Sequence, residues 1–283
     1  MIPLSHAQRR LWFLHRLEGP SATYNIPLVL RMSGPLDVPA LRAALNDVVR
    51  RHESLRTVFP EVDGDPLQSV VDVELSLDAR PVSNVTAAME AAARHKFDLL
   101  TETPLRASLF RVAPERHVLM LVMHHIVADG WSMGPLCHDL SFAYAARVAG
   151  SEPAFEPLPV QYTDYTLWKA EVLGSEDDPD SLLAEQLSFW RQQLADLPEL
   201  LQLPLDKPRP ATSSYRGATL DFTIPADVQG RLADLAKRTD TTVFMVAQAA
   251  LATLLGRLGG DVDVPIGTPV AGRDDEALDD LVG

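Results

Sequence analysis

The chain has 283 residues, of which 46% are hydrophobic, and it carries a formal net charge of −14. The length suits one large domain or two smaller ones, and the composition is typical of a globular protein. The acidic surplus argues against nucleic acid and against an anionic membrane surface as partners, because the chain has no basic surplus to neutralise phosphates. Cys137 is the only cysteine, which excludes an internal disulfide and a cysteine-cluster metal site and fits a reducing cytoplasm. No signal peptide and no apolar run long enough to span a membrane are recognisable, so we expect a cytoplasmic protein.

The first part of the chain predicts alternating helices and strands. Ser5 and Asp37 are cap residues, and apolar residues at helical spacing follow each of them. In chain order we expect a helix over 5–17, a strand over 26–32, a helix over 37–52, short strands over 55–59 and 67–73, a helix over 86–97, a hairpin of strands over 105–112 and 118–123, and a helix over 133–148.

An acidic, turn-prone stretch over 175–180 separates two apolar segments and marks a domain crossover, so we divide the chain into domains 1–174 and 175–283. The second domain predicts a helix over 182–197, an extended proline-rich segment over 198–210, a strand over 218–224, helices over 227–237 and 242–258, and a strand over 262–269. Mixed helices and strands with hairpins favour an α+β fold over a doubly wound parallel sheet.

The segment most suggestive of chemistry follows the apolar strand over 118–123: His124-His125-Ile126-Val127-Ala128-Asp129-Gly130. Adjacent residues of a strand point to opposite faces, so one histidine should face the core and the other an open cleft. This arrangement suits a metal ion poorly, and we expect no metal site. A single histidine held by its surroundings suits proton transfer, because imidazole titrates near neutral pH. The alternative is that both rings only satisfy buried hydrogen bonds.

Asp129 has two interpretations. It is either the acid that orients a histidine, as in a catalytic triad, or one half of a buried ion pair that fixes the loop, and its place before Gly130 favours the ion pair. Ser132 is expected to cap the helix that begins at Met133. The sequence offers no Gly-x-Ser-x-Gly motif, and Cys137 is expected to be an inert buried thiol.

Four segments, in order, resemble the signature motifs of the condensation domains of nonribosomal peptide synthetases. They are residues 5–14 (SHAQRRLWFL), 51–59 (RHESLRTVF), 123–132 (MHHIVADGWS) and 162–168 (YTDYTLW). The resemblance implies two chloramphenicol-acetyltransferase-like halves arranged as a V, with the histidines at the base of a tunnel between them. Residues 1–174 would form one complete subdomain, and residues 175–283 the beginning of the second.

The resemblance also implies the activity, which belongs to secondary metabolism such as antibiotic biosynthesis. The amine of an acceptor aminoacyl thioester attacks a donor thioester, and an amide forms. Donor and acceptor peptidyl carrier domains would deliver both substrates on 4'-phosphopantetheine arms, next to an adenylation domain of the same synthetase. No cofactor would bind the domain directly.

The roles of individual residues follow from the same resemblance. His125 would face the tunnel, either as the base or as a positioning hydrogen-bond partner, and His124 would be structural. Asp129 would pair with an arginine, for which Arg56 is the expected partner. Gly130 would leave room for the backbone, and its N–H would lie near the reacting carbonyl. Trp131 and Ser132 would line the tunnel.

Other readings of the motifs remain open. A stand-alone acyltransferase of the same superfamily and a non-catalytic module that recruits carrier domains or tailoring enzymes are the alternatives. His125 argues against the recruitment module, because recruiting relatives commonly lose this histidine. Epimerisation domains would continue with a Val-Ser-Trp-like segment, and heterocyclisation domains replace the histidines by aspartate. Segments 131–136 and 173–180 resemble slightly more those of condensation domains that accept a D-configured donor.

The chain ends within what resembles the beginning of a fifth motif, over 279–283. We therefore expect this fragment to be impaired in activity. A core without its covering segments also exposes apolar side chains. The residues expected to be partly uncovered are Val243, Met245, Val246 and Leu251.

Overall fold

The structure is a computed structural model that describes residues 2–198, 200–211, 214–215, 217–259 and 263–283. The chain forms two compact units, of which the first comprises Met1–Ala184 and Ala271–Gly283 and the second Glu185–Val270. The domain division between residues 174 and 175 stays a prediction. The structure adds that the last segment, 271–283, packs with the first unit.

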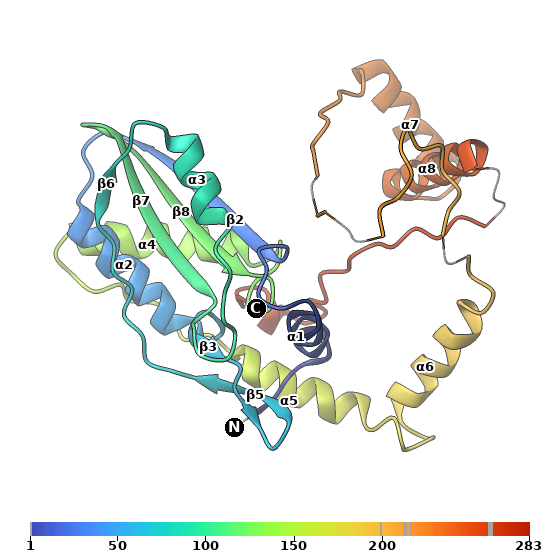
Figure 1. The fold of residues 1–283 in the computed structure, drawn as a ribbon, viewed down its shortest axis with the longest axis horizontal. Helices are drawn as coiled ribbons and strands as arrows, with labels where there is room; N and C mark the ends of the chain where they lie inside the picture. Colours follow the sequence, from blue (N-terminus) through green and yellow to red (C-terminus); the bar gives the residue numbers. More distant parts are fainter. Residues whose placement is uncertain (1, 199, 212–213, 216, 260–262) are drawn as a thin grey trace. The chain divides into compact units, whose positions relative to one another are not determined.

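A four-stranded sheet organises the first unit (Figure 1). Its strands follow in the spatial order β2 (Asn25–Ser33), β8 (Arg116–His124), β7 (Leu105–Ala113) and β6 (Ala79–Pro81). Strand β8 is antiparallel to both β2 and β7, whereas β6 pairs with β7 in parallel. Asn25 lies opposite His124 in this register, so the sheet fixes the point at which β8 ends.

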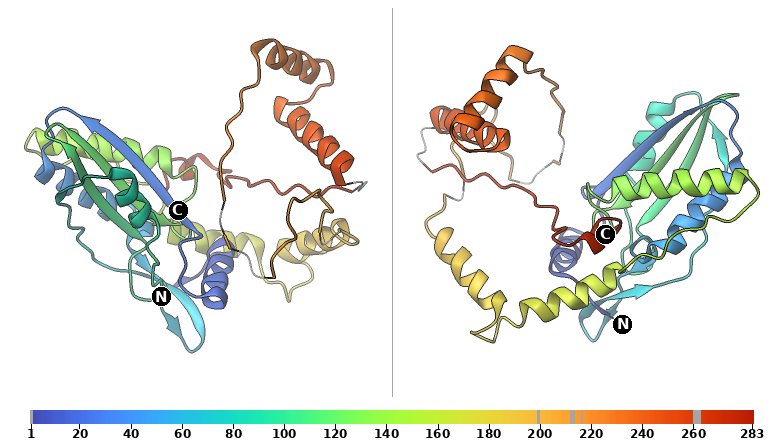
Figure 2. Two further views of the ribbon diagram at one scale, coloured as in Figure 1. Left: turned by 45° about the horizontal axis from the view of Figure 1, so that its top comes forward. Right: turned by 180° about the vertical axis from the view of Figure 1, so that it is seen from behind.

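Alternate side chains of β8 enter two separate apolar cores. Leu119, Leu121 and Met123 pack with α2 (Val38–Arg51) and α4 (Met133–Val148). Figure 2, in the view from behind, shows these two helices in front of the sheet. Val118, Met120 and Val122 pack on the other face with α1 (His6–Glu18) and α3 (Val85–Ala93). Burial on both faces explains why β8 reads as a continuous apolar run instead of an alternating one.

Side-chain caps explain where two of these helices begin. Ser5 accepts a hydrogen bond from the backbone N–H of Gln8, and the Gln8 side chain accepts one from the N–H of Ser5, which completes a capping box. Asp37 accepts a hydrogen bond from the N–H of Ala40 at the start of α2.

A second, smaller sheet lies around β5 (Asp65–Val70). Strands β1 (Ile2–Pro3), β3 (Thr57–Val58) and β4 (Glu61–Val62) each pair antiparallel with β5. A 3-10 turn, η1 (Glu53–Arg56), precedes β3, and helix α5 (Tyr162–Leu173) contacts both η1 and β1. Strand β5 therefore joins the segment after α2 to the N-terminal strand β1.

The structure confirms the expected α+β class and most expected elements of the first unit, with boundary corrections. The helix expected over 86–97 ends at Ala93, and the strand expected over 55–59 is largely the turn η1 followed by Thr57–Val58. The sequence did not predict α5 or β6.

Helix α6 (Leu182–Gln193) begins in the first unit and continues into the second, which contains α7 (Ala226–Arg238) and α8 (Val243–Gly259). The expected helices are confirmed, except that the one expected over 182–197 ends at Gln193. The strands expected over 218–224 and 262–269 are wrong for the residues described there, which have no regular structure; residue 262 lies outside them. A strand needs a neighbour to receive its backbone hydrogen bonds, and none pairs with these segments among the described residues.

Apolar side chains of α8 are largely open to solvent. Val243, Met245 and Leu251 are exposed, as expected, while Val246 is half-buried. In the described chain, no helix taken alone has the length and apolar character to cross a bilayer; α7 and α8 meet those criteria only as a pair, which is bent by 105°.

Replacement of Leu121 by alanine tests the core between β8 and the α2–α4 layer. Leu121 is fully buried, so L121A should lower the free energy of unfolding by about 2–5 kcal/mol. The matched control is L17A, because Leu17 is 69% exposed and should contribute less than about 0.5 kcal/mol. Urea unfolding followed by circular dichroism measures both, and equal losses would contradict this placement of the core.

Candidate functional site

The histidine loop, residues 124–132, leaves the C-terminal end of β8 with its backbone held by the neighbouring segments. The N–H of His124 donates to the carbonyl of Pro104 at 3.0 Å, and the N–H of His125 donates to the carbonyl of Tyr24 at 2.8 Å. The turn then closes on itself, because the N–H of Val127 donates to the carbonyl of His124 at 3.1 Å. The loop therefore begins as a rigid extension of the sheet.

His124 is buried beneath the loop, with only 2% of its surface exposed. Its Nδ1 accepts the N–H of Ile126 at 3.1 Å, so the neutral ring carries its proton on Nε2. The rings of His15, Tyr24 and Phe97 surround it. Burial, aided by the adjacent imidazoles of His15 and His125, lowers the pKa of His124 from 6.5 to about 4. His124 is thus buried and uncharged at neutral pH.

His125 lies on the opposite side of the backbone and is exposed. The burial of one histidine and the exposure of the other are as strand alternation predicted. Among the described residues, the His125 ring has no hydrogen-bond partner. Its imidazole is therefore available to an incoming group, while its backbone is fixed.

Asp129 and Ser132 close the far end of the histidine loop. Asp129 Oδ1 accepts from the Ser132 N–H at 2.9 Å and from the Ser132 hydroxyl at 2.6 Å, and the Asp129 N–H donates to Ser132 Oγ at 3.1 Å. Ser132 occupies the N-cap position of α4, as expected, but its side chain makes no capping hydrogen bond, because Oγ accepts from the N–H groups of Asp129 and Gly283 instead. Ser132 itself is fully buried.

The arginine beside Asp129 is Arg273, and the expected pairing with Arg56 is corrected. Arg273 Nη2 lies 3.5 Å from Asp129 Oδ1, and the Arg273 side chain is only 6% exposed. Arg56 instead lies 3.7 Å from both Glu53 and Asp72 and donates to the carbonyl of Val71. The contacts of Arg56 therefore join the segment around β3 and do not reach the histidine loop. The interpretation of Asp129 as one half of an ion pair agrees with the structure.

Residues 271–283 fasten the histidine loop from outside. Trp131, 46% exposed, donates its indole N–H to the carbonyl of Asp279 at 3.0 Å. The N–H of Gly283 donates to Ser132 Oγ at 3.2 Å, and Arg273 donates to the Gly283 carbonyl at 2.8 Å. Gly130 is exposed, and a Cβ placed there would meet no atom within 4 Å, so crowding within the described chain does not require this glycine.

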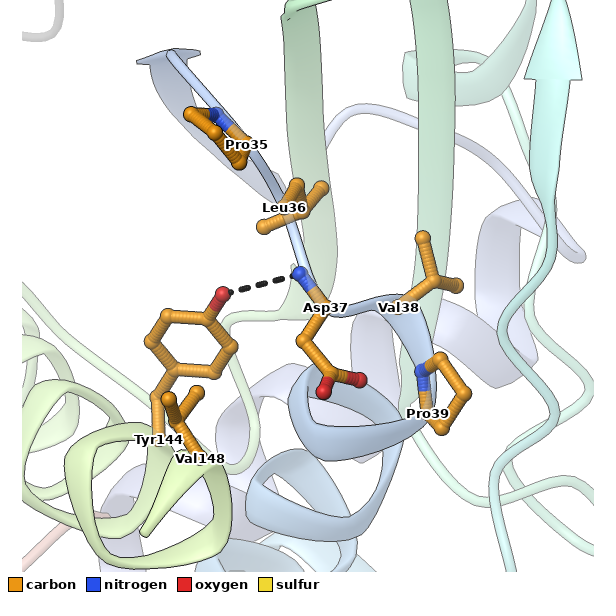
Figure 3. Close-up of a pocket in the computed structure, with 7 residues that line it drawn as sticks. All are labelled: Pro35, Leu36, Asp37, Val38, Pro39, Tyr144 and Val148. Carbon is orange, nitrogen blue, oxygen red and sulfur yellow. Dashed lines mark hydrogen bonds between the residues drawn. The ribbon is translucent and has the colours of Figure 1, made fainter.

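No group of three or more metal-ligating side chains occurs among the residues that the structure describes. A cavity of about 610 Å³ lies elsewhere, between the start of α2 and the end of α4 (Figure 3). The hydroxyl of Tyr144 lies within this cavity wall and accepts the N–H of Asp37 at 3.1 Å. None of its lining residues belongs to the histidine loop, so the cavity and the candidate site are separate features.

Sequence reasoning missed two residues that shape the site. Arg273 lies far along the chain from Asp129, and no spacing signal links them. Tyr162 was seen only as the start of a motif, yet it is buried, donates or accepts at Ser5 Oγ at 2.9 Å, and lies against Gly283. Burial raises the pKa of Tyr162, so its hydroxyl stays protonated at neutral pH.

The low pKa of His124 predicts a pH-dependent stability. Between about pH 6.5 and pH 4 the unfolded chain binds a proton at this residue and the folded chain does not, so stability falls as the pH drops, by at most about 1.4 kcal/mol per pH unit. H124N keeps an acceptor near the Nδ1 position without titrating, and it should flatten this slope. Thermal melts from pH 7 to pH 4.5 test the prediction, with H138N, which replaces an exposed histidine of α4, as the control that keeps the slope. An unchanged slope in H124N would show that His124 titrates normally.

Asp129 should act on stability through Ser132 and Arg273. D129A leaves the Ser132 donors and a buried guanidinium without their carboxylate, which should cost about 1–3 kcal/mol of unfolding free energy. In a double-mutant cycle with R273M, the two losses should not add, because they remove the same contact. D72A is the matched control, since Asp72 also faces an arginine but is fully exposed. Additive losses in urea unfolding would contradict the Asp129–Arg273 pairing.

The condensation-domain family model matches residues 1–283. Over its whole length the chain is 58% identical to part of a probable nonribosomal peptide synthetase of Salinispora arenicola, 52% to part of a dimodular nonribosomal peptide synthase of Bacillus subtilis, and 53% to part of an isonitrile lipopeptide synthase of Mycobacterium tuberculosis. The chain spans only 4% of the first of these relatives and 12% of each of the other two.

Solved structures agree with this relationship. The X-domain in a complex with OxyB from teicoplanin biosynthesis is 35% identical with a TM-score of 0.90, and the match covers all of this chain and 63% of that one. A four-domain nonribosomal peptide synthetase bound to AMP and glycine is 26% identical with a TM-score of 0.84, over all of this chain and 21% of that one. The chloramphenicol-acetyltransferase-like fold expected from the motifs is thereby confirmed. The chain belongs to the family of nonribosomal peptide synthetase condensation domains.

Proposed function

We propose that this domain forms an amide bond between two carrier-bound substrates. The α-amine of an acceptor aminoacyl thioester attacks the carbonyl carbon of a donor peptidyl or aminoacyl thioester. The new C–N bond forms as the C–S bond breaks, and the donor carrier's thiol leaves with the proton that the amine gives up. A thioester is already activated, so the reaction needs no covalent enzyme intermediate.

The observation that carries this proposal is the exposure of the His125 imidazole beside a buried, uncharged neighbour. Because the pKa of His124 is about 4, it places no positive charge next to the His125 ring at neutral pH. A neutral His125 can accept the amine's proton as a base, or it can hold the amine by a hydrogen bond while the proton passes to the thiolate. The Gly130 N–H is our candidate donor to the tetrahedral oxyanion.

The partners follow from the chemistry of the substrates. Donor and acceptor peptidyl carrier domains would bring the thioesters on 4'-phosphopantetheine arms, and a neighbouring adenylation domain would supply the acceptor amino acid. The likeness to the four-domain synthetase solved with AMP and glycine supports this assignment. The loop residues Trp131 and Ser132 are proposed to border the path of the substrates, with the exposed indole as the more accessible of the two.

Replacement of His125 by alanine should lower the condensation rate by roughly 10²-fold or more, because proton transfer or amine positioning is lost. The assay uses donor and acceptor carrier domains loaded with aminoacyl groups and measures the dipeptidyl product by mass spectrometry. H138A, which removes an exposed histidine of α4, is the control and should keep the wild-type rate. A rate for H125A near that of wild type would refute the role of His125.

The similarity to the X-domain supports a second candidate, in which the domain recruits another enzyme and catalyses nothing. A retained His125 favours catalysis instead. The same reconstitution separates the two candidates: a wild-type chain that folds, binds its loaded carriers and makes no amide would favour recruitment.

A further inference from the structure

A ring of polar residues, joined through side chains and backbone groups and buried except for the half-buried Ser5, contacts the histidine loop. It consists of Ser5, Gln8, Gln68, Thr166 and Tyr162, which we call the polar ring. Gln8 Nε2 donates to Gln68 Oε1 at 3.1 Å, and Gln68 Nε2 donates to Thr166 Oγ1 at 3.3 Å. The Thr166 hydroxyl donates to the Tyr162 carbonyl at 2.9 Å, and the Tyr162 hydroxyl meets Ser5 Oγ at 2.9 Å. Ser5 Oγ accepts the Gln8 N–H at 3.1 Å, which closes the ring.

The ring allows only one orientation for each of its two amides. Gln8 Oε1 faces the N–H of Ser5 at 3.0 Å, which can only donate, so Gln8 Nε2 must point the other way. Gln68 Nε2 faces the carbonyl of Pro3 at 2.9 Å, which can only accept, so Gln68 Oε1 must face Gln8. Gln8 and Gln68 are 2% and 3% exposed, so water does not compete for these groups.

The second proton of Gln8 Nε2 leaves the ring and points to the histidine loop. It donates to the carbonyl of Ile126 at 3.5 Å, the residue that follows His125. The loop is thus held at three consecutive backbone groups. The His125 N–H is bound to Tyr24, the Ile126 N–H to His124 Nδ1, and the Ile126 carbonyl to Gln8.

This matters because the His125 side chain has no partner of its own among the described residues. The backbone on either side therefore sets the point and direction from which its imidazole projects. The first two backbone bonds come from the sheet and from the loop itself, whereas the third comes from a helix and depends on an amide that Gln68 orients. Among the described residues, Gln8 is a side chain from outside the loop that holds the peptide between Ile126 and Val127, the second peptide after His125.

We propose that Gln8 is a positioning residue for His125, and that Gln68 acts through Gln8 by fixing the direction of its amide. The proposal rests on the proposed condensation reaction for its effect on rate, but its effect on the loop is independent of that reaction. Gln8 is 2% exposed, so its loss should change the chemical step and not the binding of carriers.

The test compares Q8M with Q161M in the 283-residue chain. Methionine keeps the length of glutamine and removes its hydrogen bonds. Gln161 is a matched control, since its side chain also joins two segments, accepting from the N–H of Glu53 at 3.1 Å and donating to the carbonyl of Arg51 at 2.9 Å, without contact to the loop. Hydrogen exchange of the peptide covering residues 121–130 is the first readout, and it requires no activity.

We expect faster exchange at His125 and Ile126 in Q8M and wild-type exchange in Q161M. With loaded carrier domains, Q8M should lower kcat by roughly 10- to 100-fold while KM for either carrier changes less than about two-fold. Q68M should fall between Q8M and wild type, and the double variant should be no slower than Q8M alone, because both act on the same contact. If Q8M does not fold, Q68M carries both readouts.

Unchanged exchange in Q8M or Q68M would overturn the proposal, as would a rise in KM at constant kcat. Equal effects from Q161M would show a general loss of stability instead of positioning. Faster exchange in Q8M with a wild-type chain that makes no amide would leave the positioning of the loop standing and would refute the proposed condensation reaction.

Discussion

Strand β8 is covered on both faces, and the position of every residue in the candidate site depends on this. Odd-numbered side chains from Leu119 to Met123 enter one core and even-numbered ones from Val118 to Val122 enter the other. His124 continues the even series and is driven under the loop among aromatic rings. A shift of one residue in register would place apolar residues of one core into the other and bring His125 inside. Burial of β8 therefore selects which histidine is buried and which is available.

Polar contacts then fix the backbone of the histidine loop, which the apolar cores do not hold. A loop cannot be held by apolar packing alone, because its backbone groups need partners. Here the Asp129–Ser132 turn satisfies the far end, the sheet satisfies the near end, and the amide of Gln8 reaches the middle. In the proposed reaction the thioester is already activated, so the main requirement on the protein is to hold the His125 imidazole in place. Rigidity of the loop is consequently the property on which a rate would depend.

Much of this arrangement could be predicted from the sequence where the signals are local. Cap residues marked the starts of α1 and α2, and the apolar run over 118–123 marked β8. Strand alternation predicted the split between His124 and His125. The predictions that failed concern contacts that neither a motif nor a periodicity reveals. Arg56 was chosen as the partner of Asp129 from a motif, whereas Arg273 occupies that place. Ser132 stands at the N-cap of α4 as expected, but its Oγ accepts from the N–H groups of Asp129 and Gly283 instead of capping the helix. The strand expected over 218–224 has apolar alternation but no pairing neighbour among the described residues, and periodicity cannot report that.

The contacts of the histidine loop also imply an order in time. The Asp129–Ser132 turn and the β7–β8 hairpin join residues close in sequence, so both can form soon after they leave the ribosome. Arg273 is 144 residues beyond Asp129 and is synthesised roughly 7–29 s later at about 5–20 residues per second. During that interval Ser132 alone occupies the Asp129 carboxylate. The turn thus holds the Asp129 carboxylate in position until Arg273 has been synthesised.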